Sequence, residues 1–561
     1  MSRDQARRIV LDHTNGRLVR AWRWSDPGEP EPWDSGLVVP GADLRTLLPA
    51  LAETESTAWI GWRRLSAGEG DPVAPTQNVP AHELVCLHAG LTDEERAHIA
   101  HLGFVEQMEG IFTPRPSRRC DWLLSPDAGW LHASVVGRIG WWSEAPSLAL
   151  ALLEFGRRAS RNGVLCCVDP AFTDHRPSGE PVRIASLAAM IKRCHGRKWL
   201  LFWAVSRTLF GPGRFTAWVE ALGSMFGAEP SAPEARVEGE LPVRRTKGAG
   251  EFGAVSVVVP TLGRPRSLAA LLRDLVKQTV PVHEVVVVAQ GRGNPQDESK
   301  PDLPVDAPFS LQWIEVEWSG ACRARNLAMS RASGDWILLL DDDVRCPPDF
   351  VESLSAEMQA WDLEAASSRV WTPDPPVRED EKFGEAFPAW RLGAMASSAD
   401  WMWPGFAGGA SMVRSDFAQR VGGFDERLDG GYGEDFDFGQ RLRDEGARFL
   451  HLQRPYVVHY HEPAGGFRAP TKQPWHEEEE PKPSPYILLS RSALHRTCRQ
   501  GYALLYLVGA LRATRWPWRM GGVLRRWRAS QRWTSRLEDR PFGGIEFWRA
   551  SPKGSGSGGD G

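Results

Sequence analysis

The sequence lacks any apolar run long enough to cross a membrane. Its longest C-terminal apolar run, YALLYLVGAL at residues 502–511, falls far short of the roughly 20 residues that a spanning helix needs. The N-terminal stretch MSRDQARRIVLDHTNGRLVR is polar and has no apolar core of the kind that marks a signal peptide. These absences predict a cytoplasmic location. Association with the inner face of the membrane stays open because of the C-terminal region considered below.

Cysteine pairs and a strong charge bias are also absent. The eight cysteines form no CxxC pair, so their spacing indicates neither a zinc site nor a disulfide framework, and we expect reduced thiols. A net charge of −4 argues against the broadly basic character of nucleic-acid-binding chains, and no nucleic-acid partner is expected. With 561 residues, 42% of them hydrophobic and 25% charged, the chain has the composition of a globular protein of about two to four domains.

Polar stretches mark the domain boundaries. GAEPSAPEARVEGELPVRRTKGAGEFG, at residues 227–253, is rich in proline, glycine and charge and has no apolar period, which is typical of a linker. A second polar stretch, APTKQPWHEEEEPKPSP, begins at residue 469, and the chain ends in the glycine- and serine-rich KGSGSGGDG. The prediction is an N-terminal α/β domain at 1–226, the linker at 227–253, a central domain at 254–468, a basic helical region at 469–550 and a flexible tail at 551–561.

The central domain alternates strand and helix patterns. The continuous apolar runs VSVVV, EVVVVA and DWILLL, together with WIEVE, predict strands, and ACRARNLAMSRAS predicts a helix. RSLAALLRDLVKQT, at residues 266–279, has leucines at helical spacing, and Ser267 is its expected N-cap. Strands that are apolar along their whole length and alternate with helices predict a parallel sheet buried on both faces.

Three consecutive carboxylates, Asp341, Asp342 and Asp343, follow the run DWILLL. Ligands of such sheets bind beyond the carboxyl ends of the strands, which is where these residues should lie. Three adjacent negative charges repel one another unless a cation neutralises them, and carboxylate oxygens suit Mg²⁺ or Mn²⁺. The alternative interpretation is a solvated acidic turn. The segment PTLGR, which ends the first strand, should bring Thr261 and Arg264 to the same edge, where a nucleotide could meet them.

Two later motifs carry further candidates. In GGYGEDFDFGQRLRDEG a glycine-rich loop leads into a predicted helix that begins with Glu434 and Asp435 and can end at Gly446. A helix N-terminus favours negative charge, so we expect Asp435 to be ionised and able to accept a proton. The alternative is that both acids merely cap the helix. In YVVHYHE, His459 ends a strand-like run and is a candidate third metal ligand.

Taken in order, six motifs resemble the family 2 inverting glycosyltransferases, which have the GT-A fold. The motifs span about residues 254–467 and read VSVVVPTLGR, GACRARNLA, ILLLDDDV, GGASMVRSDFAQRVGGFDE, GEDFDFGQRLR and VVHYHE. The resemblance implies a Rossmann-like, mostly parallel sheet flanked by helices. It also implies a divalent cation, Mn²⁺ or Mg²⁺, as cofactor, and a nucleotide-diphosphate sugar as donor.

The resemblance also implies roles for individual residues. Asp435, with Glu434 beside it, matches the catalytic base. The implied metal ligands are Asp341, Asp343 and His459. The implied nucleotide-sugar-binding residues are Thr261, Arg264, Gln290, Arg325, Asp341 and Asp342, and those near the sugar or acceptor are Trp403, Gly408 and Gly409.

One position departs from the family pattern. Where the family commonly has an aspartate after its second strand, this chain has VVVAQG with Gln290. A glutamine amide both donates and accepts hydrogen bonds and can meet a pyrimidine edge. UDP is therefore the expected nucleotide, and dTDP and GDP stay open.

The implied reaction is transfer of a hexosyl or related group, with inversion, to an acceptor hydroxyl of a glycan or a lipid-linked molecule. Such a transfer would serve the synthesis of cell-surface polysaccharide, glycolipid or another glycoconjugate. Two alternatives remain. A sugar-phosphate nucleotidyltransferase shares this kind of sheet, although PTLGR matches its glycine-rich loop poorly. The other alternative is a non-catalytic carbohydrate-binding or scaffold protein. In the central domain, Asp343, Asp435 and His459 argue against it.

The N-terminal segment DWLLSPDAGWLHASVV, at residues 121–136, resembles DWILLLDDDVRCPPDF in the central domain. Aligning the two places Asp127, Ala128 and Gly129 where Asp341 to Asp343 stand. We hypothesise a degenerate GT-A-like domain with a broken metal motif. The alternative is that DWLL is a common buried-strand pattern.

The C-terminal region LRATRWPWRMGGVLRRWRASQRWTSRLEDR interleaves arginine with tryptophan. Basic, tryptophan-containing amphipathic helices can lie on anionic membrane surfaces, which would suit a lipid-linked acceptor. A helix packed against the protein with a solvated basic face is the equal alternative.

Overall fold

The computed structural model describes residues 7–14, 16–25, 31–33, 36–55, 58–65, 85–88, 119–120, 124–161, 164–168, 184–195, 197, 200–201, 203–205, 223, 252–291, 307–371, 406, 408–429 and 434–460. These residues divide into two compact units, the first ending at 223 and the second running from 252 to 460. Most of the predicted linker, the basic helical region and the tail lie outside the described residues. Within them, no helix has both the length and the apolar character that crossing a membrane requires.

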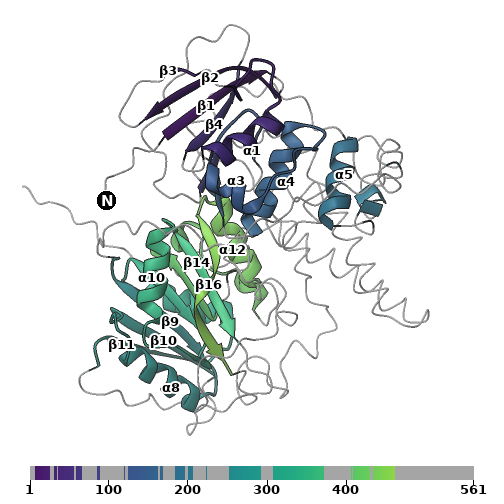
Figure 1. The fold of residues 1–561 in the computed structure, drawn as a ribbon. Coiled ribbons are helices and arrows are strands. Elements are labelled where there is room, and N and C mark those ends of the chain that lie inside the picture. Colours follow the sequence, from purple (N-terminus) through teal and green to yellow (C-terminus); the bar gives the residue numbers. More distant parts are fainter. Residues whose placement is uncertain are drawn as a thin grey trace, which may run out of the picture. The chain divides into compact units, whose positions relative to one another are not determined.

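The second unit is built on an eight-stranded sheet with the order β11-β10-β9-β12-β15-β14-β16-β13 (Figure 1). Its strands are β9 (Val255–Thr261), β10 (Glu284–Gln290), β11 (Ser310–Val316), β12 (Trp336–Leu340), β13 (Val344–Arg345), β14 (Ala365–Trp371), β15 (Ala410–Arg414) and β16 (Phe449–His459). The strands from β11 to β12 pair in parallel, whereas β15 runs antiparallel to both of its neighbours. The predicted α/β class is confirmed, and β15 makes the sheet a mixed one.

Helices cover the sheet on both sides, as the apolar strands require. The helices are α8 (Pro265–Val276), α9 (Ala321–Arg331), α10 (Phe350–Ala360), α11 (Ser415–Arg420) and α12 (Glu434–Asp444), with a 3₁₀ turn, η4 (Glu426–Leu428). All seven residues of β9 and of β10 are buried, and α9 packs against both strands. Phe438 of α12 lies in the same core and stacks on Phe424 at a centroid distance of 4.3 Å. The core thereby fixes α9 and α12 close to the carboxyl edge of the central strands.

The start of α8 differs from the prediction. Arg264, not Ser267, is the N-cap residue, and Pro265 occupies the first helical turn. Proline suits that position because its missing N–H would have no partner inside the helix. The earlier start brings Arg264 directly to the end of the first strand, which matters for the site described below.

The first unit also contains an eight-stranded sheet, with the order β3-β2-β1-β4-β7-β5-β8-β6. Its strands are β1 (Arg7–Thr14), β2 (Arg17–Ser25), β3 (Glu31–Pro32), β4 (Trp59–Arg64), β5 (Val85–His88), β6 (Arg119–Cys120), β7 (Ala128–His132) and β8 (Leu165–Val168). Its helices are α1 (Leu44–Thr54), α3 (Ala133–Ile139), α4 (Leu148–Arg161) and α5 (Ile184–His195). The α/β character predicted for the N-terminal region is therefore present in the described residues.

Two tryptophans and two glycines set the packing between β4 and β7. Trp62 pairs with Gly129, and Gly61 pairs with Trp130, across this antiparallel ladder. A Cβ added to Gly129 would lie 2.2 Å from the Trp62 ring, and one added to Gly61 would lie 2.9 Å from the Trp130 ring. Each indole therefore lies over the backbone of the opposite strand, in space that only glycine leaves.

The alignment that placed Asp127 in the position of Asp341 is wrong. Asp341 follows the carboxyl end of β12, whereas Asp127 precedes β7, a strand antiparallel to its neighbours β4 and β5. The resemblance between the two segments misled because both pair tryptophan and leucine with a nearby aspartate.

Candidate functional site

The three adjacent aspartates differ in their contacts. Asp342 is buried, and its carboxylate accepts hydrogen bonds from Thr261 Oγ1 at 2.8 Å and from Arg264 Nη1 at 3.0 Å. Burial raises the pKa of Asp342 to about 6, against the lowering effect of the Arg264 charge. Asp342 therefore ties the loop after β12 to the end of β9.

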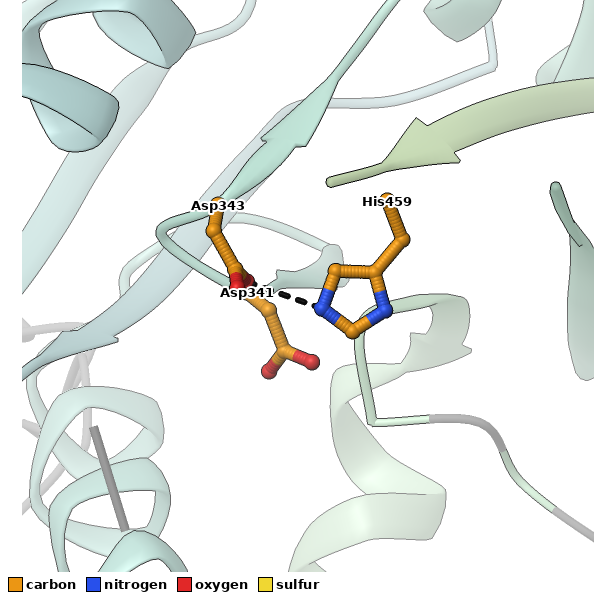
Figure 2. A group of neighbouring side chains, drawn as sticks. All are labelled: Asp341, Asp343 and His459. Atoms are coloured by element: carbon orange, nitrogen blue, oxygen red, sulfur yellow. Dashed lines mark hydrogen bonds and ion pairs between the residues drawn. The ribbon is translucent and has the colours of Figure 1, made fainter. Parts of the chain in front are cut away.

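Asp341, Asp343 and His459 form a group that could hold a metal ion (Figure 2). One ligand atom from each lies within 4.8 Å of the others, and His459 Nε2 is 3.0 Å from Asp343 Oδ1. The backbone fixes this arrangement because Val344 pairs with His459, and the Tyr460 N–H donates to the Asp343 carbonyl at 3.2 Å. Residues more than a hundred positions apart in sequence are thus held together by the β13–β16 ladder.

Gly409 makes room beside Asp341. A Cβ added to Gly409 would lie 2.6 Å from Asp341 Oδ2, so any side chain there would force the carboxylate to move. The predicted position of Gly409 near the site is consistent with this contact. The missing side chain leaves the space that the Asp341 carboxylate occupies.

Arg264 provides positive charge to residues 341–343, the aspartate loop. Its Nη1 lies 3.0 Å from Asp342 Oδ1 and 2.8 Å from Asp343 Oδ2. Both carboxylates are nearly inaccessible to solvent, so this guanidinium balances charge that water cannot screen. The sequence prediction placed Arg264 on a nucleotide, and in the structure its contacts are to the aspartates.

Asp435 lies at the start of α12 and accepts a hydrogen bond from the Gly408 N–H at 3.2 Å. Burial holds the pKa of Asp435 well above the ordinary value of 3.8, and the charges of Glu434 and Asp341 raise it further. Arg325 and the Gly408 N–H act in the opposite direction. The helix N-terminus was predicted to favour the ionised form of this carboxylate, whereas its burial acts in the opposite direction and favours the protonated form.

Arg325 connects the metal-ligand group with the start of α12. It projects from α9 and donates from Nη2 to Asp341 Oδ1 at 3.0 Å, while its Nη1 lies 3.9 Å from Glu434 Oε1. Its guanidinium is 7% exposed, and the neighbouring carboxylates raise its pKa so that it stays charged. A Cβ added to Gly408 would lie 2.6 Å from Arg325 and 2.9 Å from Asp435 Oδ1, so glycine permits the approach of these two side chains.

Two positioning residues were not singled out from the sequence. The Asp429 carboxylate accepts from the Cys322 N–H at 2.6 Å and from the Arg323 N–H at 3.3 Å, capping the N-terminus of α9. Asn326 donates to the Phe424 carbonyl at 2.8 Å and accepts from its N–H at 2.7 Å. Both contacts orient the helix that carries Arg325. Asn326 belongs to the ARN segment of the sequence. Asp429 lies about a hundred residues from its partners, so no local sequence pattern indicates its contacts.

Gln290 makes a contact outside this cluster. Gln290 is buried at the end of β10, and its Oε1 accepts from the Gly320 N–H at 2.7 Å, just before α9. Its side-chain oxygen therefore holds the loop before α9. Trp403 lies outside the described residues. The structure thus brings together Thr261, Arg264, Arg325, the three aspartates, His459, Glu434, Asp435 and both glycines.

Comparison with known proteins identifies the family of this segment. The family model described as Glycosyl transferase family 2 matches residues 256–419, which contain the aspartate loop and Arg325. A second model, described as N-terminal domain of galactosyltransferase, matches residues 392–463, which contain Asp435 and His459. Residues 256–419 are a family 2 glycosyltransferase segment, and the mixed α/β sheet that they share with β16 is of the GT-A type.

The curated relatives that match are glycosyltransferases. The uncharacterized glycosyltransferase YwdF of Bacillus subtilis is 28% identical over 30% of this chain and 62% of its own length. Validoxylamine A glucosyltransferase of Streptomyces hygroscopicus is 26% identical over 34% of this chain and 52% of its own length. The chain thus spans less than two thirds of either relative. Among solved structures, the mannosyltransferase PcManGT of Pyrobaculum calidifontis, in complex with GDP-Man and Mn²⁺, has a TM-score of 0.31 and 17% identity over 63% of this chain and 95% of its own.

Proposed function

We propose that the second unit is a metal-dependent inverting glycosyltransferase, moving a hexosyl or related group from a nucleotide-diphosphate sugar to an acceptor hydroxyl. The observation that carries the proposal is the pair of facing groups joined by Arg325. One group is formed by Asp341, Asp343 and His459, and the other by Glu434 and Asp435. A cation site beside a buried carboxylate supplies both charge neutralisation and a proton acceptor, which a single displacement requires.

The donor set fits a divalent cation. Two carboxylates and one imidazole converge within 4.8 Å, and Gly409 lets the Asp341 carboxylate pack against its backbone. Carboxylates suit Mg²⁺ and Mn²⁺, whereas an imidazole ligand favours a transition metal, so we propose Mn²⁺ with Mg²⁺ as the weaker substitute. When bound, the cation would neutralise charge that develops on the departing diphosphate. Asp341, Asp343 and His459 would hold it.

Asp435 is the proposed base. It would take the proton of the acceptor hydroxyl as that oxygen attacks the anomeric carbon from the face opposite the nucleotide. A carboxylate whose pKa is raised by burial is a stronger base than an ordinary aspartate, provided that it is ionised when the acceptor arrives. Arg325 favours the ionised form, and Gly408 orients it through its N–H.

The donor would lie across the carboxyl ends of β9, β10 and β12. Thr261, Arg264 and Asp342 form one linked group at that edge, and Gln290 ends the neighbouring strand. We propose UDP as the nucleotide, with dTDP and GDP as alternatives, and a glycan or lipid-linked acceptor. Synthesis of a cell-surface polysaccharide, glycolipid or other glycoconjugate would follow from such an acceptor.

A panel of nucleotide sugars tests the proposal. Release of nucleotide diphosphate should depend on Mn²⁺ and should be abolished in Asp343→Ala and Asp435→Ala. Asp416→Ala is the matched control, because this aspartate is 46% exposed and pairs with Arg414 away from the site. Metal-independent turnover, or full activity in either site variant, would contradict the mechanism. Release of pyrophosphate from a sugar phosphate and a nucleoside triphosphate would instead identify a nucleotidyltransferase.

A further inference from the structure

The two units share a strand ladder. In the second unit β9 and β12 are parallel, β12 is antiparallel to β15, β15 is antiparallel to β14, and β14 is parallel to β16. In the first unit β1, β4, β7, β5 and β8 follow one another in the sheet with the same sequence of parallel and antiparallel pairings. In both units the strands also occur in the same chain order. Both edges of the sheets differ. β6 follows β5 in the chain whereas β13 precedes β14, and β2 is antiparallel to β1 whereas β10 is parallel to β9.

The registers of these ladders agree as well. Trp59 pairs with His132 across β4 and β7, as Trp336 pairs with Arg414 across β12 and β15. His132 and Arg414 are each the N-cap residue of a short helix, α3 and α11 respectively. Because one register shift would turn every side chain to the other face, the agreement lets each position of one unit be matched with a position of the other.

The helix before the last strand confirms the match at atomic detail. In α4 the segment EFGRR includes an ion pair between Arg158 and Glu154, four residues apart. In α12 the segment DFGQR includes the same pair between Arg441 and Asp437. Arg158 also donates to the carbonyl of Ile139, the last residue of α3, and Arg441 donates to the carbonyl of Val421, the residue after α11.

These correspondences show which residues of the first unit stand at the positions of Asp341 and Asp435. The position of Asp341, after the last residue paired in β12, falls on Arg64 in β4. Leu65 and Ser66 follow it, so the run of three carboxylates is replaced entirely. Along the helix, the position of Asp435 falls on Leu152, which is fully buried. Neither a metal-binding carboxylate nor a base stands at these places.

The space at the donor position is also filled. The position of Gly409, which leaves room beside Asp341, falls on Asp127. Arg64 Nε lies 3.1 Å from Asp127 Oδ1, and the two side chains are 12% and 8% exposed. The Arg64 N–H also donates to the Asp127 carbonyl at 2.7 Å. An internal ion pair between Arg64 and Asp127 thus takes the place that Asp341 and Gly409 occupy in the second unit.

We infer that the first unit is a second copy of the GT-A-type sheet in which the Arg64–Asp127 ion pair closes the donor position, so that each chain binds one nucleotide at the second unit. The number of nucleotides bound per chain rests on the proposed function of the second unit. The closure of the donor position by Arg64 and Asp127 rests on the first unit alone. The first unit is then a non-catalytic relative of its neighbour in the same chain.

Calorimetric titration of the full chain with UDP, GDP and dTDP, each with Mn²⁺, tests the count. The expected stoichiometry is one nucleotide per chain, and Asp343→Ala should abolish it. Arg64→Ala and Asp127→Ala should leave the stoichiometry at one and the dissociation constant within about twofold. Two nucleotides per chain, or one nucleotide still bound by Asp343→Ala, would overturn the inference.

A double-mutant cycle tests the closure without any nucleotide. Arg64→Ala, Asp127→Ala and the double variant should be strongly non-additive in thermal unfolding, with a coupling of about tenfold in the unfolding equilibrium constant. The exposed pair Arg414 and Asp416 is the matched control and should show a coupling below about threefold. Additive effects of Arg64→Ala and Asp127→Ala would overturn the closure. Failure of all three nucleotides to bind the unaltered chain would count against the proposed function and leave the cycle to decide the closure.

Discussion

His459 Nε2 lies 3.0 Å from Asp343 Oδ1, joining the last residue of β16 to the loop after β12. The contact depends on the β13–β16 pairing, which sets the imidazole beside the two carboxylates. A ligand set completed by the final strand means that the whole sheet must close before a cation can be held.

The first prediction concerns metal choice. His459→Gln removes the imidazole but keeps an oxygen ligand, so the Mn²⁺ concentration for half-maximal activity should rise about 10- to 100-fold. The preference for Mn²⁺ over Mg²⁺ should shrink, because imidazole favours the transition metal. Metal titrations of initial rate measure both effects. An unchanged Mn²⁺ dependence would exclude His459 as a ligand.

The second prediction concerns pH. Burial raises the pKa of Asp435 above 3.8, and only its ionised form can accept a proton. Turnover should therefore fall as pH decreases through this raised pKa, at a pH well above that of an ordinary aspartate. A profile of kcat against pH shows the acid limb. Asp435→Asn should lower kcat by about 10²- to 10⁴-fold, and its residual rate should lack the limb. A flat profile in the unaltered enzyme would assign the base elsewhere.

The third prediction concerns Arg325. Replacing it with methionine leaves Asp341, Glu434 and Asp435 without their shared cation, so the pKa of Asp435 should rise further. The acid limb should move to higher pH by about one unit, which corresponds to roughly 1.4 kcal/mol. Arg325→Lys keeps the charge and should restore part of the shift. A loss of activity with no movement of the limb would indicate a role in folding or donor binding instead.

The fourth prediction concerns Gly409. Gly409→Ala places a methyl group 2.6 Å from Asp341 Oδ2 unless that carboxylate turns away. The apparent affinity for Mn²⁺ should fall by on the order of tenfold, equivalent to about 1.4 kcal/mol. Gly36→Ala is the control, because an added Cβ there meets nothing within 4 Å. Equal metal dependence of the two variants would show that Asp341 can move without cost.

Much of the second unit could be predicted because its strands are locally unambiguous. The apolar runs that form β9, β10 and β12 leave no polar face, and Glu434 and Asp435 follow the glycines that start α12. The aspartate loop and His459 were placed at one edge by motif order, and the structure brings them together.

The errors arose where distant residues decide the outcome. Pairing direction and register depend on contacts between strands, so the sequence matched residues 121–136 to the wrong strand of the second unit. The charge state of Asp435 depends on its burial and on Asp341 and Arg325, which come from other elements. The cap that Asp429 gives to α9 joins segments about a hundred residues apart and has no local pattern.

Arg264 lies where it could respond to two ligands of the site, a cation and a nucleotide. It lies 2.8 Å from Asp343 and is also held by Asp342, whose other oxygen is bound to Thr261 at the strand end. A cation arriving at Asp343 would compete with this guanidinium and release it toward an incoming phosphate. Cation and nucleotide should then strengthen each other's binding, and linkage requires the factor to be the same for both ligands.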